Sequence, residues 1–358
     1  MPNLSDKLAR AAIDHEIDLL RVAASANRRV QALLTALQND IAGRLSQSHL
    51  SAFATARLTA VLRDVRELIS GAYGGIDDVM MKRLTDLAPI EAAITAGTVN
   101  NIVGISLMEG TLPKATLRVL YSDTMIMGAP SSQWWLKQAQ DVTFKFAQAI
   151  RKGMAVGETN GELIARVRGI DSIFQGPRRQ AEALVRTSVQ TVANAARLAV
   201  MKDNSDVLLG YQQLSTLDDR TTEICQAYDM QTWDLDGKPI RGTTLPFINE
   251  EGSFAGVPRH FNCRSVLVPL VKSWEDILGV DIGEFTPTQR ASMDGAVAGK
   301  MTYEDWLNTK SEELQDKILG PGKAQLWRDG KITTRDLVNS ATGRPLTLTE
   351  LKAQHGLV

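Results

Sequence analysis

The sequence has few of the residues that define secreted, membrane-spanning or strongly nucleic-acid-binding proteins. It contains two cysteines in 358 residues, 5% aromatic residues and a formal net charge of −1. Two cysteines exclude a disulfide framework, and a charge near zero excludes a strong electrostatic bias of the whole molecule toward nucleic acid. No apolar run approaches the ~18 residues that a membrane helix needs, and the first residues do not open a signal peptide. We therefore expect a globular protein that is made in the cytoplasm.

The rest of the composition, with 44% hydrophobic and 23% charged residues, is typical of a globular chain of two or three domains. We predict an α+β fold that is predominantly α. Long helices occupy residues 1–130, a small sheet packed on a long helix occupies 131–275, and short helices occupy 276–358.

Helical spacing of apolar residues dominates the first region. The spacing predicts a helix that runs through Ile41 and breaks at Gly43, a second from Ser51 to Ile69, and a third from Ile76 to about Thr98. Helical arms poor in aromatic residues often pack against other chains. An autonomous helical bundle is an equal alternative.

The middle region combines helices with strand signals. A helix is predicted from Pro177 to about Lys202, and strands are predicted at 207–214, 231–235 and 265–271. The predicted helix is net basic, so it could contact DNA phosphates, although charged helix faces are usually only solvated. The basic residues are Arg178, Arg179, Arg186, Arg197 and Lys202. The adjacent Trp134 and Trp135, which open a helix predicted to run to about Gly153, could anchor a partner, but such a pair more often belongs to a core.

Short helices are predicted in the last region, one of them beginning at Thr288-Gln289-Arg290. The segment Gly320-Pro321-Gly322-Lys323 weakly suggests a phosphate loop. It lacks the required first glycine and the hydroxyl residue after the lysine, so we interpret it as the start of a helix.

Both cysteines lie in a split motif with one histidine. Cys225 ends the segment Asp218–Cys225, and His260 and Cys263 follow about thirty-five residues later. These three side chains are good zinc ligands, and the fourth ligand would be a carboxylate, a water or nothing. The candidate carboxylates are Asp218, Asp219 and Asp229. Packing, hydrogen bonding or a thiol pair explains the same residues without a metal, and an open fourth position would permit metal-dependent catalysis.

The acidic and basic residues of the motif also have a structural interpretation. Asp219 is expected to cap a short helix that Arg220 begins, with Thr221 in the same turn. Arg220 or Arg264 could bridge to an aspartate and hold the loops together.

An ordered set of residues resembles the phage head morphogenesis or minor head proteins, of which the Mu F-like proteins are members. The set covers about residues 177–271 and ends in His260-Phe261-Asn262-Cys263-Arg264. The family pattern at this last site commonly reads His-Pro-Asn-Cys-Arg-Cys. Phe261 replaces the proline here, and Ser265 replaces the second cysteine.

The resemblance implies a virion or procapsid component of a tailed phage, synthesised in the host cytoplasm and located at or near the portal vertex. Its implied partners are the portal protein, the major capsid or scaffolding protein, and packaged DNA, with no membrane involved during assembly. Enzymatic activity is not implied. The alternative that the residues leave open is a metal-dependent enzyme acting on DNA or cell wall through Cys225, His260 and Cys263.

Overall fold

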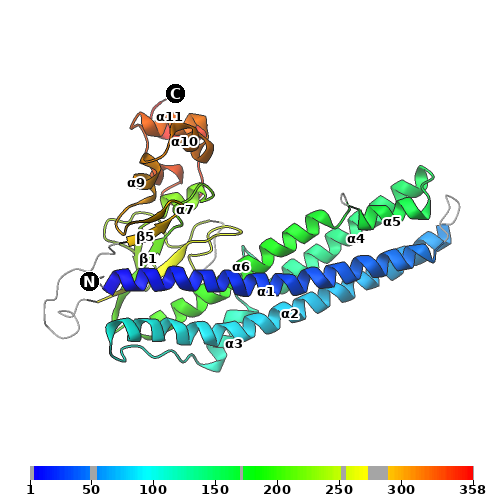
Figure 1. The fold of residues 1–358 in the computed structure, drawn as a ribbon, viewed down its shortest axis with the longest axis horizontal. Coiled ribbons are helices and arrows are strands. Elements are labelled where there is room, and N and C mark those ends of the chain that lie inside the picture. Colours follow the sequence, from blue (N-terminus) through cyan, green and yellow to red (C-terminus); the bar gives the residue numbers. More distant parts are fainter. Residues whose placement is uncertain (1–3, 49–54, 170–171, 251–254, 273–288, 358) are drawn as a thin grey trace.

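The computed structural model describes residues 4–48, 55–169, 172–250, 255–272 and 289–357. Two long helices, α1 (Leu4–Ser46) and α2 (Thr55–Val103), pack against each other along the molecule. At a rise of 1.5 Å per residue they are about 65 and 74 Å long. Together they form much of an elongated helical arm that extends well beyond the sheet (Figure 1).

The prediction of two separate helices at 51–69 and 76–98 is wrong, because α2 runs without a break from Thr55 through both; residues 51–54 lie outside the described part. Ile69, Tyr73, Ile76 and Met80 are all buried. Their spacing of three and four residues carries one apolar stripe across the glycines between them. Packing of that stripe outweighs the low helix propensity of glycine. The break predicted at Gly43 is absent for the same reason, since α1 continues to Ser46.

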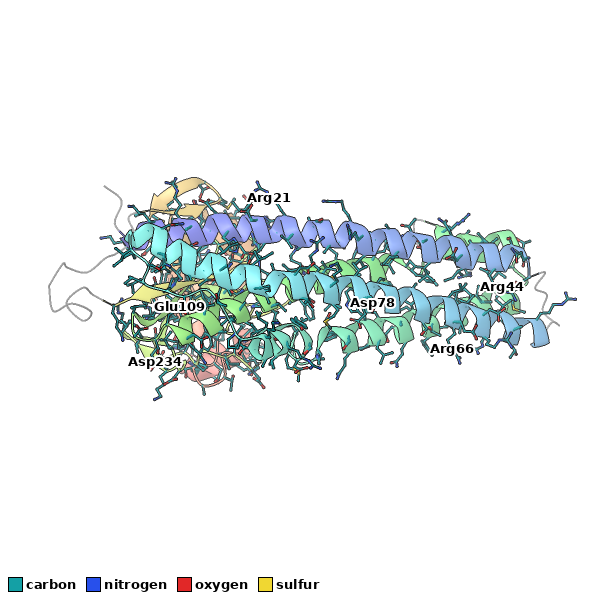
Figure 2. All side chains as sticks on the ribbon, turned by 90° about the horizontal axis from the view of Figure 1, so that it is seen from below. Arg21, Arg44, Arg66, Asp78, Glu109 and Asp234 are labelled. Carbon is teal, nitrogen blue, oxygen red and sulfur yellow. The ribbon has the colours of Figure 1, made fainter. Side chains whose placement is uncertain are left out.

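Further helices complete the arm alongside α1 and α2. The longest, α6, packs against α1 and α2, and α4 packs against α2 and α6. Trp135 is buried in this core, which confirms the core interpretation for that residue, whereas Trp134 is only half-buried. Figure 2 shows Arg44 and Arg66 toward one end of the arm and Glu109 and Asp234 at the other. The helices are α3 (Lys114–Ser122), α4 (Ser131–Ala155), α5 (Asn160–Arg168) and α6 (Gln175–Asp203).

A four-stranded antiparallel sheet packs through β4 against α1 and α6. Its order is β3-β2-β1-β4, and Tyr211 of β1 lies opposite Trp233 of β2 on one side and Pro269 of β4 on the other. A Cβ at Gly210 would lie 2.0 Å from the carbonyl oxygen of Trp233, so this close strand approach requires glycine. The predicted small sheet on a long helix is confirmed. The strands are β1 (Leu208–Leu214), β2 (Thr232–Asp234), β3 (Pro239–Ile240) and β4 (Val266–Val271).

The C-terminal region forms a small lobe with its own hydrophobic cluster, in which Leu217 packs with Tyr303, Trp306 and Trp327. The predicted helix at Thr288-Gln289-Arg290 is wrong for its described residues, which begin a β-hairpin; Thr288 lies outside the described part. Ser292 pairs with Gly295 across the turn, and Gly295 has a φ of 109° that favours glycine. The elements are β5 (Gln289–Ser292), β6 (Gly295–Ala298), α9 (Tyr303–Asn308), α10 (Glu312–Leu319), α11 (Pro321–Arg328), the 3₁₀ helix η1 (Thr334–Leu337) and α12 (Leu348–Gln354).

The first two predicted domains share one hydrophobic core. A single cluster of buried residues extends from Leu8 of α1 through α2, α4 and α6 to Val268 of β4 and Val338. The helical arm therefore supplies part of the core on which the sheet depends. Among the described residues, no helix is long and apolar enough to cross a membrane.

Candidate functional site

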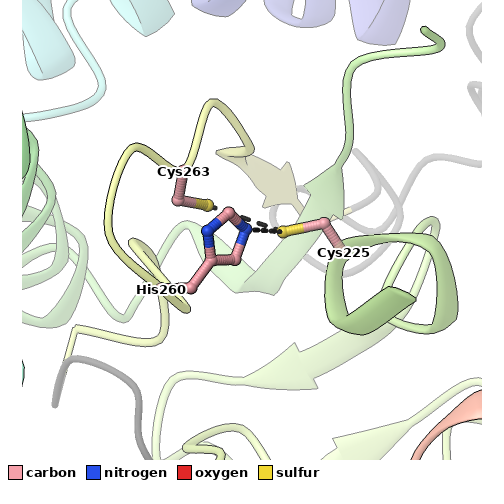
Figure 3. A group of neighbouring side chains, drawn as sticks. All are labelled: Cys225, His260 and Cys263. Atoms are coloured by element: carbon pink, nitrogen blue, oxygen red, sulfur yellow. Dashed lines mark hydrogen bonds between the residues drawn. The ribbon is translucent and has the colours of Figure 1, made fainter. Parts of the chain in front are cut away.

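The split motif converges on a Cys–His–Cys cluster beside the sheet (Figure 3). Cys225 lies on the short helix α7 (Glu223–Ala227), and His260 and Cys263 lie on the loop before β4. The Cys225 sulfur is 3.2 Å from Nε2 of His260 and 3.6 Å from the Cys263 sulfur. All three candidate ligand atoms lie within 4.8 Å of one another. Tertiary structure thus brings together the three residues that the sequence singled out.

Local contacts hold the cluster in this geometry. His260 Nδ1 lies 2.8 Å from the carbonyl oxygen of Phe261. Because a carbonyl only accepts, Nδ1 donates, and Nε2 lies 3.2 Å from the Cys225 sulfur and 2.8 Å from the Thr222 hydroxyl. In the neutral ring Nε2 then carries the lone pair that a metal would bind. The Ser215 hydroxyl donates to the Cys225 carbonyl at 2.6 Å. The Asn262 amide donates to Thr187 on α6, which ties the loop to the arm.

The spacing of the donor atoms fits a zinc ion. Bond lengths of about 2.3 Å to sulfur and 2.0–2.1 Å to nitrogen place tetrahedral ligand atoms about 3.5–3.8 Å apart. The observed 3.6 Å between the sulfurs lies in that interval, and the 3.2 Å to His260 is slightly shorter. A cavity of about 20 Å³ adjoins the cluster, and the hydroxyl-bearing Thr222 and Ser265 line it with Cys225. One water fits in this volume.

The carboxylates predicted as fourth ligands are all engaged elsewhere. Asp218 binds Arg264, with Nη2 donating to Oδ1 at 2.8 Å. Asp219 pairs with Lys317 at 2.7 Å, and Asp229 is buried against Arg290. None of them joins the cluster of three ligand atoms. In this geometry each of the three carboxylates would have to leave its present partner to reach the cluster.

The two thiols differ in their protonation. The hydrogen bond from Cys225 holds the pKa of Cys263 well below its usual range. Burial acts in the opposite direction, but the contact with His260 adds to the lowering. The same hydrogen bond together with burial raises the pKa of Cys225. Burial opposes the charged form of His260, but its contact with Cys263 outweighs this and raises the pKa. Negative charge is therefore favoured on Cys263 over Cys225, and the thiolate is the form of cysteine that binds metal.

A fully buried arginine next to the cluster was not among the predicted site residues. Arg259 is 0% exposed, and its Nε donates to Gln213 Oε1 at 2.6 Å and its Nη1 to the Phe247 carbonyl at 2.9 Å. Its guanidinium lies 3.5 Å from the centroid of the Tyr228 ring. Burial lowers its pKa to about 10. The sequence signal was its place inside the motif, directly before His260.

The acidic motif residues have roles that differ in part from prediction. Asp218, not Asp219, organises the turn, because its Oδ1 accepts from the Arg220 amide and the Thr221 hydroxyl. The helix begins at Glu223 with Thr222 as its N-cap, so Asp219 caps nothing and Arg220 does not begin it. The predicted bridge from Arg264 to an aspartate is confirmed. Burial alone would raise the pKa of Asp218, but Arg264 outweighs it and holds the pKa below its usual range.

Two ion pairs fasten the C-terminal lobe to this motif. Lys323 donates to both carboxylate oxygens of Glu223 at 2.7 Å, and Lys317 pairs with Asp219. The Tyr303 hydroxyl donates to the Asp218 carbonyl. The segment Gly320–Lys323 thus starts a helix, as interpreted from the sequence, and its lysine serves this contact.

The basic residues predicted on α6 do not form one surface. Arg197 is 5% exposed and pairs with the buried Glu91, so it cannot contact DNA in this structure. Arg178 donates to side chains of α1. Arg186 pairs with Glu182 and Asn262. The exposed Arg179 and Lys202 are 23 residues apart, or about 35 Å along the helix.

The fold and the site define an α+β protein in which a buried Cys–His–Cys cluster closes a small sheet against a long helical arm. Residues 144–268 match the family model described as phage Mu protein F like protein. The matched region begins within α4, contains α6 and the whole cluster, and ends within β4. About a third of the chain, including the whole cluster, is therefore similar to the phage Mu protein F like family. No curated protein and no solved structure matches the chain.

Proposed function

We propose that the protein is a minor head component of a tailed phage, associated with the portal vertex and involved in head assembly and in handling or ejecting the packaged DNA. The observation that carries this proposal is the arm. Its two longest helices have 43 and 49 residues and extend far past the sheet that they help to support. A long, laterally packed helical body provides a rigid surface for neighbouring proteins. Phe144 on this body is 68% exposed, and large exposed apolar side chains favour protein contacts.

The proposed partners are the portal protein and the major capsid or scaffolding protein, and the proposed location is the virion. Contact with packaged DNA remains a prediction that now rests on Arg179 and Lys202, since the other basic residues of α6 are buried or engaged in contacts within the chain.

Quantitative mass spectrometry of purified, DNA-filled particles tests the proposal. We expect a low and fixed number of copies relative to the major capsid protein. A protein that is present in procapsids but absent from filled particles would instead be a transient assembly factor. Absence from both would overturn the head-component proposal.

We also propose that Cys225, His260 and Cys263 bind one zinc ion that stabilises the fold. In this position zinc would supply a cross-link between α7 and the loop before β4. The burial of both cysteines supports a structural role over a catalytic one, and so does a cavity of about 20 Å³, which cannot admit a nucleotide or a sugar. Elemental analysis of the purified protein tests this directly, with one zinc per chain expected. A metal-free protein that is equally stable in the presence of a chelator would exclude the proposal.

The competing enzyme hypothesis makes a different prediction for His260→Ala. A structural site predicts loss of stability and of bound zinc in this variant. A catalytic site predicts a folded, metal-containing variant that has lost hydrolysis of DNA or cell wall.

A further inference from the structure

The two cysteines of the cluster are placed for a reaction with each other as well as for metal binding. Their sulfurs lie 3.6 Å apart and point toward each other, and both residues are 2% exposed (Figure 3). They are the two cysteines of the whole sequence, so neither has another thiol in the chain to pair with. Cys225 lies on α7 and Cys263 on the loop before β4. A bond between them would therefore join the same two elements that a shared metal ion would join.

Only a short movement separates this pair of thiols from a disulfide. A sulfur–sulfur bond is about 2.05 Å long, so the two sulfurs would have to approach each other by about 1.5 Å. Cys263 lies between a turn and β4, outside the regular hydrogen bonding of the sheet. A shift of this size at Cys263 therefore leaves the hydrogen bonds of the sheet in place.

The small polar cavity beside the cluster gives a small oxidant access to one of the sulfurs. Cys225 is the cysteine that lines this cavity of about 20 Å³. Arg220, whose side chain is 77% exposed, forms part of the wall, so the cavity meets solvent. The hydroxyls of Thr222 and Ser265 can form hydrogen bonds with a polar guest. Hydrogen peroxide is little larger than the water that fits there, whereas oxidised glutathione is far too large.

We propose that Cys225 and Cys263 are a redox-sensitive pair, which hydrogen peroxide converts into a disulfide with release of the metal. The inference rests on the proposed zinc site and extends it. The Cys225 sulfur attacks one peroxide oxygen, the O–O bond breaks, and a sulfenic acid and one water form. The Cys263 sulfur then attacks the sulfenic sulfur, the S–O bond breaks, and a second water leaves.

The atoms and electrons of this reaction balance without a further reactant. The two sulfurs together lose two electrons, and the peroxide gains them. The hydrogens of the two thiols, or protons from solvent where a thiol is ionised, end in the two waters. Neither sulfur then carries the negative charge with which a thiolate binds zinc, and His260 remains as a single ligand.

Oxidation thus exchanges one cross-link between α7 and the loop for another. A reducing cytosol keeps cysteines as thiols, and an oxidising medium favours disulfides. In the proposed virion location, the protein would pass from the first environment to the second when the particle leaves the host. The disulfide would then hold the two elements together where the metal is lost.

Peroxide treatment of the purified full-length protein tests the inference. Elemental analysis first gives the zinc content, a chromogenic chelator then follows zinc release, and peptide mapping without reductant identifies the sulfur products. We expect zinc release together with a peptide cross-linked through Cys225 and Cys263, and reversal of both changes by reductant and added zinc. Oxidised glutathione at the same concentration should act at least about tenfold more slowly, because it cannot enter the cavity.

The Cys263→Ser variant removes the second sulfur and keeps the one that lines the cavity. Peroxide should then add oxygen to Cys225, trapped as the sulfenic acid by dimedone, and no cross-linked peptide should form. Circular dichroism establishes that the variant is folded. An unreactive Cys225 in a folded variant would overturn the proposed route through the cavity, and so would equal rates with peroxide and oxidised glutathione in the wild-type protein.

Two results for the wild-type protein would overturn the inference itself. One is retention of both thiols under peroxide, and the other is oxidation of the sulfurs to sulfinic acids without a cross-link. A protein that holds no zinc before treatment would refute the proposed metal site instead. Peptide mapping would still decide whether the two cysteines form a redox pair, so the two failures are distinguishable.

Discussion

The guanidinium of Arg259 stacks on the ring of Tyr228, 3.5 Å from its centroid, in the interior of the domain. It donates hydrogen bonds to neutral oxygens of Gln213 and Phe247, and the thiols of Cys225 and Cys263 are among the titratable groups around it. A buried cation next to the cluster stabilises negative charge on the sulfurs. The stack therefore links the packing of the sheet to the electrostatics of the cluster.

Replacing Arg259 by lysine should lower the free energy of unfolding by about 3 kcal/mol, because an ammonium cannot stack as a plane or satisfy both Gln213 and Phe247. Urea unfolding followed by circular dichroism measures this. Arg179→Lys on the exposed face of α6 is the matched control and should change the unfolding free energy by less than about 0.5 kcal/mol. Equal stability of the two variants would show that the stack is not required.

Glu16 should make stability depend on pH. Burial, opposed in part by Arg197, raises its pKa to about 8, and the side chain also faces Gln190, Glu91 and Cys263. Because the folded state holds the proton more tightly than the unfolded chain does, protonation of Glu16 favours the fold. This contribution to the free energy of unfolding is fully present below pH 4.5 and is lost as the pH rises through 8. Between pH 6 and 9 the unfolding free energy should fall by about 2–3 kcal/mol from this group.

The Glu16→Gln variant isolates that contribution, because glutamine keeps a carbonyl oxygen for Gln190 and cannot ionise. Urea unfolding of both proteins at pH 6 and pH 9 gives the difference. We expect the free energy of unfolding of Glu16→Gln to fall less between pH 6 and pH 9 than that of the wild-type protein, so that the variant is the more stable protein at pH 9. Parallel declines in the two proteins would assign the pH dependence to other groups.

Arg197 should matter for stability rather than for DNA contact. Arg197→Met leaves Glu91 buried without its arginine and should cost about 3–5 kcal/mol. Arg179→Met should leave stability unchanged. If the protein binds DNA through α6, Arg179→Met should weaken that affinity and reduce its salt dependence. A stable Arg197→Met protein with reduced DNA affinity would contradict the burial of this residue.

Ser265 lines the small cavity beside Cys225, so it is the side chain from which a fourth protein ligand could reach a zinc ion bound by the cluster. Ser265→Cys should create a site with three sulfurs and one nitrogen, so zinc should be released more slowly to a chelator. Zinc release is measured with a chromogenic chelator under reducing conditions. Ser132→Cys, an exposed serine on α4, is the control for an added thiol. Unchanged release from Ser265→Cys would show that residue 265 does not face the ion.

The two lysines that fasten the C-terminal lobe should contribute unequally. Lys323 is 14% exposed at its side chain and binds both oxygens of Glu223, whereas Lys317 is 67% exposed. We expect Lys323→Met to cost about 1–2 kcal/mol and Lys317→Met less than about 0.5 kcal/mol. Hydrogen exchange in α9 to α11 would show whether the lobe loosens. Equal effects would mean that burial does not decide the strength of these pairs.

The sequence predicted the cluster and the class of fold because both have local signatures. Cysteine and histidine are rare in this chain, so their grouping around Cys225 and His260 indicated a site without knowledge of the fold. Periodicity gave α6 and three strands of the sheet to within a few residues. The same method failed at Ser70-Gly71, because a break in propensity does not reveal that α1 and α6 stabilise the helix there from outside.

By itself the sequence determined the residue types available to the site, the helical character of the arm and the family resemblance, since each depends on residue identity and short-range order. Only the tertiary structure decided which charges are buried and which carboxylates are already paired. Arg197 and Arg179 show why. Both are arginines on one helix, but one faces Glu91 in the core and the other faces solvent. Burial and electrostatic partners depend on packing between elements far apart in the chain, and residue order alone does not specify that packing.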